Sequence, residues 1–214
     1  MLVEVILSAL LLLVTYWFIV TRQLSSAVAA YSVQSWLLGL VSLALYVDTK
    51  LIGLLLFGLL IVTVKGVLIP RVFRHQVAFA LVAGRETAYY VRFPTALLVG
   101  TGLSLVGLLA ATRLPLVTQL LPPSILGISL AVFLLGLFTS IARRDAILQV
   151  AGLLAAENGL LLLSLVVAPR LSLLIEVAIV MDVLIAVLVM GFLVARMRDA
   201  GAGTDTSELT RLRG

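Results

Sequence analysis

Cysteine is absent from this chain, and its only histidine is His75. Without thiolates the chain itself cannot form a disulfide, hold an iron–sulfur cluster or build a cysteine-ligated metal site. A single histidine also argues against a haem or zinc centre held by this chain alone. We therefore expect no cofactor in this chain. The lack of cysteine leaves the redox compartment undetermined.

Charge is the second shortage. Only 12% of the 214 residues are charged and 63% are hydrophobic, and the mean hydropathy is +1.26. A globular domain has about 25% charged residues, so a soluble protein of this length would have too few charged side chains to cover its surface. The composition predicts an all-α, polytopic transmembrane helix bundle, which we place in the inner (cytoplasmic) membrane. The net charge of +5 comes from arginines spread between apolar runs, so we expect no nucleic-acid partner.

Apolar runs long enough to cross a bilayer number about seven, at about 20 residues for each crossing. The expected spans are 3–21, 26–47, 51–70, 93–112, 123–142, 146–168 and 171–195. The first run has Glu4 where a signal peptide carries basic residues, so we expect it to be retained as a span. The stretch 71–92 holds too short an apolar piece to cross, and an interfacial helix is one interpretation of it.

Basic residues predict the orientation of the bundle. The loops after the first, third and fifth expected spans, with the C-terminal tail, carry Arg22, Arg71, Arg74, Arg85, Arg92, Arg143, Arg144, Arg196, Arg198, Arg211 and Arg213. The opposite side carries Lys50, Arg113 and Arg170. The positive-inside rule therefore predicts an N-terminus outside and a C-terminus in the cytoplasm.

Ionisable residues inside the expected spans are Glu4, Lys65, Glu157, Glu176 and Asp182. Each costs at least about 2.5–3.5 kcal/mol at a helix centre, so each needs a partner, water or a place near an end. We expect Glu4 and Glu176 to reach the outer interface. Lys65 has two alternatives: its stem reaches the cytoplasmic headgroups, or it faces inward and supplies positive charge near a carboxylate.

Glu157 and Asp182 are expected at one depth. Each lies about eleven residues from the turn that joins their two antiparallel spans, which places both roughly 15 Å from the outer face at 1.5 Å per residue. A desolvated carboxylate can titrate near neutral pH, so a pair at one depth predicts a proton relay. The alternative is structural, with both acids only hydrogen-bonded to neighbouring helices. Asn158 would suit such interhelical hydrogen bonds.

Several short motifs resemble a known family. Residues 123–214 resemble the K-type subunit of respiratory complex I, related to a subunit of multi-subunit sodium/proton antiporters, through "ARRD", "AENG" and the third-helix acid Asp182. The whole chain resembles hydrogenase-4 component E of formate hydrogenlyase-type complexes, through "VKGVLIP", "AENG", "IEVAIVMDVLIAV" and "LTRLRG". Two departures weaken a transfer of geometry. Leu154 stands where the complex I relative has its second-helix acid, and the third-helix acid is aspartate.

The resemblance implies a division and a role. It divides the chain into a four-span region, 1–122, with cytoplasmic loop 71–92, a three-span unit, 123–198, and a polar tail, 199–214. It implies a non-catalytic membrane subunit of a complex I-like group 4 nickel–iron hydrogenase, with nickel–iron and iron–sulfur centres in partner subunits. The implied partners are antiporter-like membrane subunits, a quinone-site-like membrane anchor, a soluble hydrogenase arm and the lipid bilayer.

Under this resemblance particular residues receive roles. Glu157, Asp182, Lys65 and Glu176 would belong to a proton (or sodium) path, with Asn158 in support. Arg143 and Arg144 would contact the cytoplasmic arm or its membrane anchor. The alternatives are a non-conducting scaffold between antiporter-like neighbours, a component of a multi-subunit sodium/proton antiporter, and a self-contained secondary transporter. An inverted repeat, common in secondary transporters, is not evident.

Overall fold

The computed structural model describes residues 2–74, 93–114, 121–169 and 191, and these residues contain no β-strand. The elements are α1 (Leu2–Val20), α2 (Leu24–Thr49), α3 (Ile52–Leu60), the π-helix η1 (Ile61–Leu68), α5 (Phe93–Arg113), α6 (Pro123–Ala142) and α7 (Ala146–Val167). The described part of the chain has six helices long and apolar enough to cross a membrane. One of them, Ile52–Arg74, runs through both α3 and η1.

The expectation of an all-helical, multi-pass membrane protein is therefore confirmed for the described residues. The first six expected spans correspond to observed helices. The seventh, 171–195, lies almost wholly outside the described residues, so the count of seven and the orientation stay predictions. The proposed interfacial stretch 71–92 differs at its start, because the third helix continues to Arg74; its remainder also lies outside the described residues.

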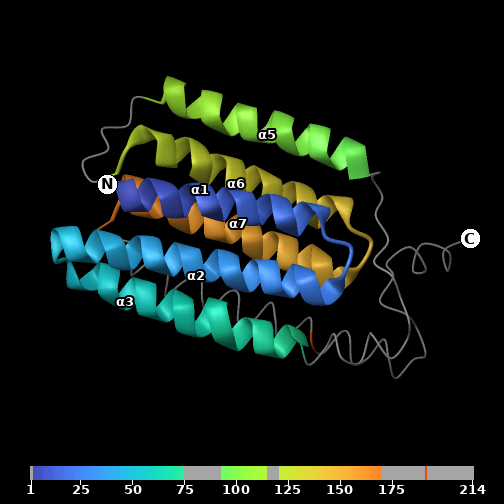
Figure 1. Cartoon of the computed structure of the whole chain (residues 1–214), viewed down its shortest axis with the longest axis horizontal. Coiled ribbons are helices and arrows are strands. Elements are labelled where there is room, and N and C mark those ends of the chain that lie inside the picture. Colours follow the sequence, from blue (N-terminus) through green and yellow to red (C-terminus); the bar gives the residue numbers. More distant parts are fainter. Residues whose placement is uncertain (1, 75–92, 115–120, 170–190, 192–214) are drawn as a thin grey trace, which may run out of the picture.

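The helices form a bundle with two peripheral members. Figure 1 shows α5 at one edge and α3 at the opposite edge, with α1, α2, α6 and α7 between them. Helix α6 packs against α7, α5 and α1, while α2 packs against α1, α7, α3 and η1. Helix α2 therefore stands between η1 and α7, and this places polar side chains of three helices close together.

Glycines bring α6 and α7 into close backbone contact. A Cβ atom added to Gly136 would overlap the backbone of Ala156, and one added to Gly159 would overlap the backbone of Phe133. Small residues at such positions are typical of helix pairs in membranes, where close packing replaces the hydrophobic effect as the source of association. The contact fixes the face of α7 that carries Ala156 toward α6, and so fixes the direction of the next residue, Glu157.

We expect Gly136→Ala to destabilise the bundle by about 1–3 kcal/mol, because a methyl group must be forced between two packed backbones. Gly102 on α5 is the matched control, since a Cβ there meets nothing within 4 Å. Thermal unfolding in detergent, followed by size-exclusion chromatography, measures the difference. Equal melting temperatures for Gly136→Ala and Gly102→Ala would contradict the close contact.

The π-helical segment has a cause in the sequence. Pro70 has no N–H, and in an α-helix its ring clashes with the carbonyl of the residue four positions earlier, which is Gly66. A π-helix moves each hydrogen bond one residue further along the chain. Accordingly, the Ile69 N–H donates to the carbonyl of Val64, five residues back. The proline therefore explains why the helix departs from α geometry on its N-terminal side.

Candidate functional site

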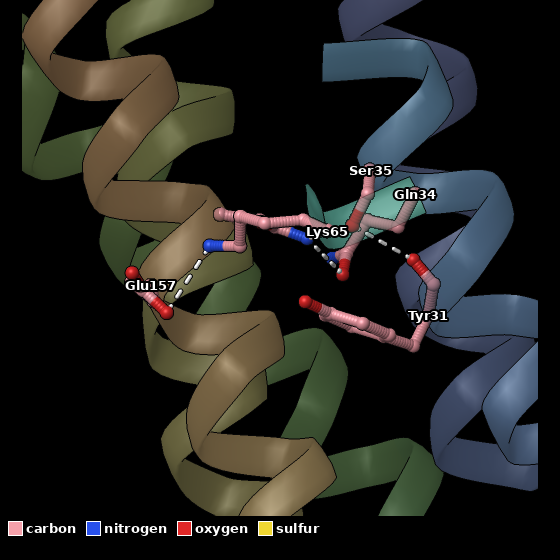
Figure 2. A network of polar contacts seen from close by, with 6 residues as sticks. Tyr31, Gln34, Ser35, Lys65 and Glu157 are labelled. Carbon is pink, nitrogen blue, oxygen red and sulfur yellow. Dashed lines mark hydrogen bonds and ion pairs between the residues drawn. The ribbon is translucent and has the colours of Figure 1, made fainter. Parts of the chain in front are cut away.

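A buried ion pair joins the third helix to α7. The Nζ atom of Lys65, in η1, lies 3.1 Å from Oε2 of Glu157, and the side chains are 0% and 13% exposed. Figure 2 shows the lysine stem extended toward the glutamate. Of the two alternatives for Lys65, the structure therefore has the inward one. Each charge gives the other the partner that an ionised group inside a membrane needs.

An amide and hydroxyl network adjoins the ion pair. Nδ2 of Asn158 donates to Oε1 of Gln34 at 3.1 Å and lies 3.1 Å from Oγ of Ser35. The Gln34 amide in turn donates to Oγ1 of Thr15 at 2.9 Å. All four side chains are buried. Asn158 thus makes the interhelical hydrogen bonds that its position suggested, and the network ties α7 to α2 and α1.

Tyr31 adds a phenol to this site from α2. Its side chain is fully buried, and its backbone carbonyl accepts a hydrogen bond from Oγ of Ser35 at 3.1 Å. In Figure 2 the ring points from α2 toward the helix that carries Glu157. A phenol both donates and accepts hydrogen bonds. Tyr31 thus adds a polar group from α2 beside the ion pair.

Sequence reasoning missed the contribution of α2 and α1. It weighed only ionisable residues, whereas Tyr31, Gln34, Ser35 and Thr15 are uncharged. A signal was present: in α2 these polar residues recur one helical turn apart, at 31 and at 34–35, within an apolar span. Uncharged polar residues on one face of a span are expected to face other helices rather than lipid.

The remaining acids give mixed results. Glu176 and Asp182 lie outside the described residues, so the depth match between Glu157 and Asp182 stays a prediction. Glu4, expected at the solvated outer interface, is instead buried. Glu4 is buried because α1 lies against α2, which covers this end of the helix.

Arg143 differs from the expectation that it contacts a partner. Its side chain is fully buried, and Nη2 donates to the carbonyls of Phe18 (2.9 Å), Ile19 (3.2 Å) and Thr21 (2.8 Å). The last carbonyls of a helix have no donor within the helix, and a cation there also matches the helix dipole. Arg143 therefore caps α1 inside its own chain. Arg144 is partly exposed.

A change of protonation at either residue would alter the charge balance of the pair. With both side chains ionised the pair is electrically neutral, and protonating Glu157 leaves the positive charge of Lys65 without its counter-charge. In a low-dielectric interior that change is large, so proton exchange at one residue is strongly coupled to the other. Among the described residues no cluster of histidine, aspartate and glutamate suits a metal ion.

Comparison with known proteins shows that several are similar to this chain. An uncharacterized protein of Mycobacterium tuberculosis is 28% identical over 165 residues, which are 75% of this chain and 73% of that protein. Hydrogenase-4 component E of Escherichia coli and that of Shigella flexneri are each 34% identical over 102 residues, 48% of this chain. No protein-family model and no solved structure matches the chain.

The match to component E covers 46% of that protein, so it spans about half of each sequence. The resemblance to component E inferred from the motifs is confirmed to that extent. The resemblance to the K-type subunit of complex I stays a prediction. Over about half of its length, this chain is similar to hydrogenase-4 component E.

Proposed function

We propose that this chain is a membrane subunit of a hydrogenase complex, in which the Lys65–Glu157 pair forms part of a proton (or sodium) path. The single observation that carries the path is the 3.1 Å contact between these two side chains inside a bundle of apolar helices. A buried ion pair is commonly no more stabilising than apolar side chains of the same volume. A scaffold that only joined neighbouring subunits would not need a buried ion pair.

The proposed step is a change of charge at Glu157. A proton that reaches the carboxylate neutralises it, and the ammonium of Lys65 is then held without a counter-charge. That state favours release of the proton from Glu157 to the next carrier. The Asn158–Gln34–Thr15 network holds the helices in place during the exchange. Lys65 already occupies the cation position, which favours a proton over sodium as the transported ion.

The rest of the path and the partners belong to the same proposal. Asp182 and Glu176, in the expected seventh span, are proposed as further carriers. Antiporter-like and quinone-site-like membrane subunits would flank the chain in the inner membrane, and a soluble arm would hold nickel–iron and iron–sulfur centres. Arg144, partly exposed, remains the proposed contact to that arm.

Co-purification tests membership of the complex. With an affinity tag on this chain, we expect membrane subunits and a hydrogenase-active soluble arm to be recovered together from mild detergent, because mid-membrane charges are shielded by protein neighbours. The tag on an unrelated inner-membrane protein is the control. Recovery of the chain alone as a stable, ion-transporting protein would contradict the subunit proposal and favour a self-contained transporter.

A further inference from the structure

We propose that Ser32 and Trp36 are positioning residues: by binding the carbonyl oxygen of Gly66, they hold the π-helical segment so that Lys65 meets Glu157. Both side chains come from α2 and lie one helical turn apart. This inference rests on the proposed function for its effect on transport, whereas its geometric part stands on the contacts alone.

The carbonyl of Gly66 accepts hydrogen bonds from outside its own helix. In an α-helix it would accept from the N–H four residues later, but that residue is Pro70, which has none. Inside a membrane a backbone carbonyl without a donor costs several kcal/mol. Neighbouring helices and serine side chains are the usual means of satisfying backbone groups freed by a proline.

Helix α2 supplies two such donors. Oγ of Ser32 donates to the Gly66 oxygen at 2.7 Å, and Nε1 of Trp36 donates to the same oxygen at 3.1 Å. Gly66 itself admits the indole, because a Cβ there would lie 2.9 Å from both Cδ1 and Nε1 of Trp36. Pro70 and Gly66 on the third helix and the two donors on α2 thus form one contact site, which we call the Gly66 anchor.

The Gly66 anchor also positions the neighbouring residue, Lys65. Lys65 precedes Gly66 in the chain, so anchoring the Gly66 carbonyl to α2 fixes the rotation of this segment about its axis and, with it, the direction in which the Lys65 side chain leaves the helix. The stem of Lys65 must pass α2 to reach Glu157 on α7, since both η1 and α7 pack on α2. A rotation of the segment would carry the ammonium away from the carboxylate.

The test combines Ser32→Ala with Trp36→Phe, which removes both donors and keeps the bulk of the tryptophan ring. The control combines Ser26→Ala with Trp17→Phe. Trp17 and Trp36 are similarly exposed, at 43% and 45%, and the Ser26 hydroxyl donates only to Gln23. Neither double variant touches Lys65 or Glu157. Size-exclusion chromatography verifies that each assembled complex is intact.

Because the chain has no cysteine, the proximity of positions 65 and 157 can be measured by cross-linking cysteines introduced there. Lys65→Cys and Glu157→Cys are introduced together in each background, and the assembled complex is treated with a short bis-methanethiosulfonate. We expect the yield to fall by at least about half without the two donors and to stay unchanged in the control, since the position of residue 65 depends on them. Equal yields in the two backgrounds would overturn the inference.

Transport in liposomes is measured separately, with Lys65 and Glu157 intact. A misplacement of about 1 Å can cost 10²-fold in rate, so we expect at least about a tenfold loss without the donors. If the cross-linking yield falls while transport is unchanged, positioning stands and the proposed role of the ion pair is wrong. Gly66→Ala, which pushes the indole away, should reproduce the lower yield; Gly53→Ala, where a Cβ meets nothing within 4 Å, should not.

Discussion

Glu157→Gln is expected to lower proton translocation by the assembled complex at least about tenfold, because a group that exchanges protons in the transition state contributes 10²–10⁴-fold. Glutamine keeps the shape and polarity of the side chain and cannot titrate. The ion pair with Lys65 is lost, yet the hydrogen bonds of Asn158 to α2 remain. Hydrogen chemistry with artificial electron carriers should be unchanged, since in the proposed complex it belongs to the soluble arm.

Proton uptake into liposomes that contain the complex measures this effect. Glu4→Gln is the matched control, because it removes another buried carboxylate at the far end of α1. Asp182→Asn should lower translocation as well, if the expected seventh span carries a second acid of the path. Normal pumping by Glu157→Gln would show that the carboxylate only makes hydrogen bonds.

Removing one member of the ion pair is expected to destabilise the chain more than removing both. Lys65→Met leaves Glu157 without its cation, and a broken buried pair typically costs about 3–5 kcal/mol. Lys65→Met combined with Glu157→Met replaces two charges by apolar side chains of similar volume, which is often neutral or stabilising. The double variant should therefore recover most of the stability lost by either single variant, while translocation stays low in all three.

Thermal unfolding of the purified complex in detergent gives the three differences, and a double-mutant cycle isolates the coupling between the two positions. Thr63→Val is a suitable control on the same helix, since the Thr63 hydroxyl is exposed and donates only to backbone carbonyls of its own helix. Additive effects of the two single variants would mean that Lys65 and Glu157 do not stabilise one another. Translocation measured in the same variants tests whether stability and transport are separate properties of this site.

The spans were predictable because the thickness of a bilayer fixes the length of an apolar helix, and hydropathy is a property of the sequence alone. The identity of the partner of Glu157 could not be predicted in the same way. Sequence reasoning compared Glu157 with Asp182 because a short turn joins their helices and sets a common depth. It left open whether Lys65 reaches the headgroups or faces a carboxylate, because contact between the third and sixth observed helices depends on tertiary packing around α2.

Arg143 and Pro70 illustrate two further limits. The positive-inside rule counts every loop arginine in the same way, so it could not distinguish an arginine that caps α1 from one at the surface. Pro70, four residues after Gly66, was a readable signal that the third helix would depart from α geometry. The sequence does not reveal which helix supplies the donors for Gly66, because Ser32 and Trp36 are distant along the chain.

The cap that Arg143 places on α1 also bears on biogenesis. Helix α1 is synthesised first, but the guanidinium that binds the Phe18 carbonyl lies 125 residues later. Until that arginine has been translated, the C-terminal carbonyls of α1 depend on water or headgroups at the membrane surface. The N-terminal hairpin of α1 and α2 is therefore completed only after the end of α6 is inserted. A ribosome stalled before that point would leave an intermediate whose first helix lacks this cap.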